Sequence, residues 1–212
     1  MRREKMKKYL TMFIVSALCA VIGISVSGET ADSFEEKLKE GIRLHNEARL
    51  DPAVNIEKSR KILGDLMDKS PVAKAYYGSL ITIEAGLYAE KKNGIRALSL
   101  LDEGTHLIDE AVRMAPDDPD LHLLRMINSY GVSRSSPLNR YQVMKKDIDW
   151  LDERQLSPDP VRQGVIELYR GLYLARSRRI DEALEAFEAC VTISPGSSEA
   201  AEAERQLMLY AE

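Results

Sequence analysis

Histidine side chains are the first candidates for chemistry, because imidazole ligates metals and transfers protons near neutral pH. The chain has three histidines, His45, His106 and His122. Metal sites need clustered ligands, as in the helical pattern H-x-x-x-H, and no two of these histidines are spaced in that way. The chain also has no glycine-rich phosphate loop and no G-x-S-x-G nucleophile elbow. We therefore expect no enzyme activity, no metal and no cofactor, and three ordinary histidines at helix surfaces or boundaries.

Clustered carboxylates are the second candidate for chemistry. Asp117, Asp118 and Asp120 surround Pro119, which could suggest calcium. The cluster lacks the glycine and the distal glutamate of an EF-hand loop. Aspartate before a proline is better explained as a helix cap, where its charge also suits the helix dipole. A second set is expected to form a solvated helix face: Asp147, Asp149 and Asp152.

The first residues predict the compartment. Five basic residues precede an apolar run at 9–26, and small residues mark its end at Ser25, Ser27 and Gly28. This order is that of a secretory signal peptide at 1–27, with cleavage before Gly28 and a mature domain at 28–212. The alternative is a retained inner-membrane anchor, with membrane association through residues 9–26, because about 18 apolar residues can just span a bilayer. Both place the domain outside the cytoplasm, in the periplasm or cell envelope.

The charge balance argues against nucleic acid as a partner. The chain has 30 basic and 34 acidic residues. Residues 1–27 hold five of the basic residues and one of the acidic ones, so residues 28–212 have 25 basic and 33 acidic residues. A net charge of about −8 with no basic cluster does not suit a phosphate backbone. The mature part has one cysteine, Cys190, so it cannot form an internal disulfide.

Helix signals divide the mature chain into short amphipathic segments. Four prolines follow residues that cap helices: Asp51-Pro52, Ser70-Pro71, Asp118-Pro119 and Asp159-Pro160. The stretch Gly131–Asn139, rich in serine and glycine, predicts a loop. Short turns between the segments favour an all-α fold of about four helical hairpins, with a C-terminal capping helix after Ser197.

One segment carries a recognisable repeat pattern. Gly171 is followed by an Ile180-Asp181-Glu182-Ala183 turn, and then by Phe187, Cys190 and Pro195. This unit resembles the 34-residue tetratricopeptide repeat. Half of a second unit matches at Gly104, Ile108, Ala111 and Pro116. From Pro71 to Pro116 is 45 residues, so the middle hairpin must be longer than the family standard.

The resemblance implies a right-handed superhelical array whose first helices line a concave groove. Tyr169, Leu172 and Arg176 would face that groove, Gly171 would lie against Ala183, and Cys190 would be a packed thiol. The family's peptide clamp uses Lys and Asn where this chain has Leu168 and Leu172, so that clamp is absent. An alternative is that the tyrosines only fill gaps between helices.

The expected function is an exported scaffold that binds a protein or peptide partner in the cell envelope. The rival hypothesis is a small-ligand-binding accessory subunit of an envelope transport system.

Overall fold

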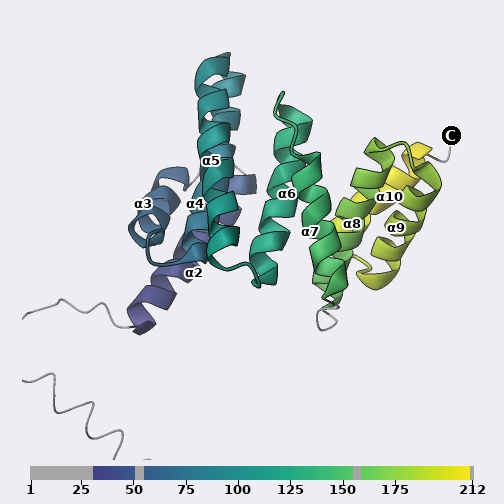
Figure 1. Ribbon diagram of the computed structural model, residues 1–212, viewed down its shortest axis with the longest axis horizontal. Coiled ribbons are helices and arrows are strands. Elements are labelled where there is room, and N and C mark those ends of the chain that lie inside the picture. The colour runs from purple at the N-terminus through teal and green to yellow at the C-terminus, as the bar shows by residue number, and fades with distance from the viewer. Residues whose placement is uncertain (1–30, 51–54, 155–158, 211–212) are drawn as a thin grey trace, which may run out of the picture. The chain divides into compact units, whose positions relative to one another are not determined.

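Every element that the structure describes is an α-helix. The computed structural model describes residues 31–50, 55–154 and 159–210, and no strand occurs among them (Figure 1). The helices are α2 (Ala31–Leu50), α3 (Ile56–Leu66), α4 (Pro71–Glu90), α5 (Gly94–Met114), α6 (Pro119–Ser135), α7 (Tyr141–Glu153), α8 (Pro160–Arg176), α9 (Ile180–Ile193) and α10 (Ser198–Tyr210).

Consecutive helices pack in pairs. Helix α4 packs on α5, α6 on α7, and α8 on α9, while α10 closes the series against α9 and α8. Helix α2 contacts α3 through a hydrogen bond from the Ser59 hydroxyl to the Gly41 carbonyl, at 2.9 Å. The described residues therefore confirm the predicted all-α, tetratricopeptide-like arrangement of four hairpins and a C-terminal helix. From Glu36 to Glu212 the chain forms one compact unit by itself.

The predicted leader, 1–27, lies outside the described residues. Among the helices that the structure does describe, none has the length and apolar character needed to span a bilayer.

Three of the helices begin, as predicted, with a capping residue that stands directly before a proline. Ser70 accepts a hydrogen bond from the Ala73 amide at 3.2 Å, and Asp118 accepts one from the Asp120 amide at 2.9 Å. Asp159 accepts one from the Val161 amide at 3.0 Å. The predicted Asp51-Pro52 start lies outside the described residues. The described part of that helix begins at Ile56.

The middle hairpin is long, as the spacing of its prolines predicted. Helices α4 and α5 have 20 and 21 residues, whereas α8 and α9 have 17 and 14. At its centre two glycines face each other. A Cβ added to Gly104 would lie 2.5 Å from the Gly78 carbonyl oxygen. The two backbones therefore touch at a point where no side chain fits.

The last hairpin has a similar close approach, in which the nearest atoms to Gly171 belong to Phe187. A Cβ added to Gly171 would overlap the ring of Phe187, one turn beyond Ala183. Ala183, Phe187 and Cys190 are all fully buried in the core of this hairpin. The large ring of Phe187 therefore fills the space that the glycine leaves, in the same cluster as Ala183.

The predicted loop at Gly131–Asn139 is wrong over its first half. Helix α6 continues through Gly131 to Ser135. Val132 is buried in a cluster with Ile81, Leu100 and Leu101. This packing holds the last turn helical despite a local composition that favours a loop, so the connection shrinks to residues 136–140.

Candidate binding groove

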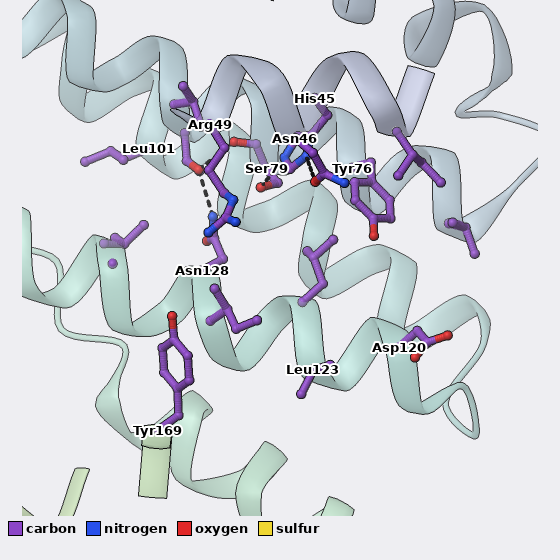
Figure 2. A pocket seen from close by; sticks show the side chains of 18 of the residues that line it. His45, Asn46, Arg49, Tyr76, Ser79, Leu101, Asp120, Leu123, Asn128 and Tyr169 are labelled. Carbon is purple, nitrogen blue, oxygen red and sulfur yellow. Dashed lines mark hydrogen bonds between the residues drawn. The ribbon is translucent and has the colours of Figure 1, made fainter. Parts of the chain in front are cut away.

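A cavity of about 580 Å³ opens between alternate helices of the array. Most of its lining comes from α2, α4 and α6, with Tyr169 from α8 and Glu199 from α10 (Figure 2). Only Leu101, on α5, comes from the second helix of a pair. The cavity therefore lies on the face formed by the first helices of the hairpins.

Much of the wall is aliphatic. The side chains that give it this character are Ile42, Val72, Ile83, Leu123, Leu124 and Ile127. Tyr76 adds an aromatic ring, which meets the His45 ring edge-to-face at 5.0 Å between centroids. A wall of this kind can bury an apolar side chain of a ligand.

Polar side chains interrupt this wall at positions set by hydrogen bonds. The Asn128 amide nitrogen on α6 donates to the Thr82 hydroxyl on α4, at 2.7 Å. His45 Nε2 lies 2.9 Å from the Ser79 hydroxyl, and its Nδ1 lies 3.1 Å from the Asn46 side-chain oxygen. The polar groups are thus oriented by the fold before any ligand arrives.

The environment of His45 keeps its ring neutral. Burial lowers the pKa of His45 to about 4; the hydrogen bond with Asn46 opposes this change, and the charge of Arg49 adds to it. His45 as a whole residue is 3 % exposed, although we expected a surface or boundary residue. That expectation is wrong, because helix α4 covers this face of α2 with Tyr76 and Ser79.

We expect His45 to make the protein sensitive to acid. The folded-state pKa lies below the unfolded value, so this contribution to stability is complete above about pH 6.5 and is lost as pH falls towards 4. By pH 4.5 the loss is about 2 kcal/mol. Urea unfolding at pH 7 and pH 4.5 should show this loss in the wild type and a smaller loss in His45→Gln. The exposed His106 provides the control: His106→Gln should behave as wild type, and an equal loss in both variants would contradict the assignment.

Arg49 supplies a cation at the cavity. It follows His45 by one helical turn on α2, and its side chain is exposed. Among the described residues, no carboxylate forms an ion pair with it, whereas Arg43 on the same helix pairs with Glu40 and Glu47. Within the described part of the chain, the Arg49 guanidinium therefore stays available for an ion pair with a ligand at the groove.

Tyr169 faces Arg49 from α8. Figure 2 shows the two side chains pointing toward one another from α2 and α8. Burial raises the pKa of Tyr169 to about 12, and the positive charge of Arg49 opposes this rise. The Tyr169 ring also packs edge-to-face on Tyr130, with centroids 5.5 Å apart. Its hydroxyl therefore stays protonated and can donate a hydrogen bond into the groove.

The three residues expected to bind a partner do not meet at the cavity. Tyr169 lines it, but Leu172 is 9 % exposed and packs in the core of the last hairpin. Arg176 lies over the Tyr141 ring of α7, 5.5 Å from its centroid. Seven residues along a helix correspond to about 10 Å, so the end of α8 reaches beyond the groove.

A second polar cluster lies between α6 and α7, around a fully buried aspartate. Asp147 has no exposed surface and accepts hydrogen bonds from Arg125 Nε at 2.9 Å and Nη2 at 2.6 Å. Its other close neighbour is His122 Nδ1, at 2.7 Å, and His122 Nε2 lies 2.9 Å from the Pro116 carbonyl oxygen. The His122 ring stacks on Trp150 with centroids 3.8 Å apart.

This cluster corrects two expectations. His122 is not a surface or boundary residue, and Asp147 does not belong to a solvated face, because both are buried at the helix pair. Asp149 and Asp152 do lie at the exposed surface of α7. The described residues hold no group of three or more His, Cys, Asp or Glu side chains placed to bind a metal ion.

Comparisons with known proteins leave the family open. No protein-family model matches the chain, and no curated protein matches it. Among solved structures, the chain is similar to MamA of AMB-1, with 15 % sequence identity, 86 % of each chain covered and a TM-score of 0.48. With so few shared residues and so low a TM-score, this similarity carries no information about partners or activity.

Proposed function

We propose that the chain is an exported helical-repeat scaffold that binds a protein or peptide partner in the cell envelope. The observation that carries the proposal is the cavity on the face formed by the first helices of successive hairpins. Its aliphatic wall, two tyrosines and oriented polar groups are the mixture found in binding sites for other molecules. The basic and apolar leader at 1–27 supports the location.

The rival proposal is a small-ligand-binding accessory subunit of an envelope transport system. One observation favours it: a volume of about 580 Å³ falls within the usual range of ligand pockets. The open arrangement of the lining over six helices favours a longer ligand that crosses from one hairpin to the next.

Ile83→Glu separates these proposals from a purely structural role for the groove. Ile83 lines the cavity and is only partly buried, so a carboxylate there blocks the apolar wall while the core stays intact. Capture of a partner from the envelope fraction, quantified by mass spectrometry, should fall by about tenfold or more. Circular dichroism should show unchanged helicity.

Leu98→Glu is the matched control. Leu98 lies on α5 outside the cavity and is 40 % exposed, so this variant should capture the partner as the wild type does. Equal capture by the wild type, Ile83→Glu and Leu98→Glu would contradict the proposal that the partner binds in the groove. A small molecule that co-purifies with the wild type in native mass spectrometry, and is lost in Ile83→Glu, would favour the rival. A partner found only in the cytosolic fraction would contradict the location.

A further inference from the structure

Each carboxylate that lines the groove has a partner other than Arg49, and Arg49 forms no ion pair among the described residues. Asp118 caps α6, Asp120 pairs with Arg162 at 2.7 Å, and Glu199 accepts from the Ser198 hydroxyl at 2.8 Å. A cation at a partly apolar cavity with no charge partner favours a ligand that supplies the missing negative charge.

Two further groups are placed to bind the same anion. The Tyr169 hydroxyl is a protonated donor and points toward Arg49 (Figure 2). The Asn128 amide nitrogen is held by Thr82, so its carbonyl oxygen remains to accept from a ligand N–H. A guanidinium and a hydroxyl suit a carboxylate, and an amide oxygen beside them suits the backbone of a peptide.

The wall next to these groups is apolar. Leu123 and Ile127 are spaced four apart on one face of α6, five residues and one residue before Asn128, and Ile83 faces them from α4. A ligand that places a carboxylate at Arg49 therefore has an aliphatic surface available for an adjacent side chain. The groove combines one charge position with one apolar position.

We infer that the groove binds a peptide segment in which an Asp or Glu contacts Arg49 and Tyr169 while a neighbouring aliphatic or aromatic side chain packs against Ile83, Leu123 and Ile127. This inference rests on the proposed function and adds the chemistry of the partner. Arg49, rather than the end of α8, sets the charge preference.

Peptide display with a charge swap tests the inference. Random peptides are selected on the purified full chain and on Arg49→Glu. The wild type should enrich an acidic residue beside Leu, Ile or Phe, and Arg49→Glu should enrich Lys or Arg at that position. A synthetic peptide from the wild-type selection should bind about ten- to a hundredfold more tightly than its Asp→Asn or Glu→Gln analogue, as expected for a charge-assisted hydrogen bond.

Arg43→Glu is the matched control, because Arg43 is an exposed arginine on α2 that does not line the cavity. It should enrich the same acidic peptides as the wild type. An acidic preference that survives in Arg49→Glu, or that is absent from the wild type, overturns the inference.

The remaining outcomes separate this inference from the function on which it rests. Peptides that bind only with an intact Ile83, but irrespective of charge at residue 49, leave the groove function standing and overturn the acidic preference. If no selected peptide depends on Ile83 for binding, both the groove function and the acidic preference are overturned. If decanoate binds in an Arg49-dependent way and no acidic peptide does, the anion site belongs to a small acid. That result overturns the inference that the ligand is a peptide.

Discussion

Asp147→Ala should lower the free energy of unfolding by about 3–5 kcal/mol, the cost of removing one partner from a buried ion pair. The carboxylate is wholly enclosed and is bonded by Arg125 and His122. Without it, the carboxylate that remains near the Arg125 guanidinium among the described residues is Asp109, at 3.7 Å. The substitution also leaves a void beside the stack of His122 and Trp150. Urea unfolding followed by circular dichroism measures the loss.

Two variants on the same helix show whether burial of the charge is the cause. Asp147→Asn keeps the size and one acceptor oxygen but not the charge, so it should still destabilise the protein. Asp149→Ala removes an exposed aspartate that pairs with Lys145, and it should cost less than about 1 kcal/mol. A cost for Asp147→Ala as small as that of Asp149→Ala would show that α6 and α7 do not depend on this network.

The fold was predictable because its signals are local. A capping residue before a proline acts within one turn of a helix, and Ser70, Asp118 and Asp159 form the caps that the sequence predicts. The small residues of the repeat pattern act between adjacent helices of one hairpin. The prediction of a loop at Gly131–Asn139 fails over its first half for the opposite reason. Val132 holds that half helical by packing against α4 and α5, which are far away in the sequence.

The groove was less predictable because its residues meet only through tertiary packing. Arg49 and Tyr169 are 120 residues apart, and nothing in the spacing of either indicates the other. Asp147, by contrast, carries a signal of burial in the sequence. It lies between the buried Met144 and Ile148, with Leu151 one turn further, so it is a charged residue within the apolar stripe of its helix. A charge in that position requires a buried partner.

The close approach of α4 and α5 gives the second large effect. We expect Gly104→Ala to destabilise the protein by about 3 kcal/mol or more, at or above the upper end of the usual cost of overpacking. The new methyl group would lie 2.5 Å from the Gly78 carbonyl oxygen and 2.7 Å from a methyl carbon of Thr82. A backbone carbonyl inside a helix cannot rotate away, so the two helices must separate. This cost exceeds the gain of about 1 kcal/mol from the better helix propensity of alanine.

Substitutions at two other glycines serve as comparisons, because an added methyl group meets different atoms there. At Gly171 the added methyl group meets the Phe187 ring, a side chain that can turn, so Gly171→Ala should cost less, about 1–3 kcal/mol. Gly86, on the same helix as Gly78, has no atom within 4 Å of an added Cβ, so Gly86→Ala should stabilise the protein by about 0.5–1 kcal/mol. Thermal unfolding of the three variants should therefore place Gly104→Ala lowest and Gly86→Ala above the wild type. If Gly104→Ala were no less stable than Gly171→Ala, α4 and α5 would not be in backbone contact.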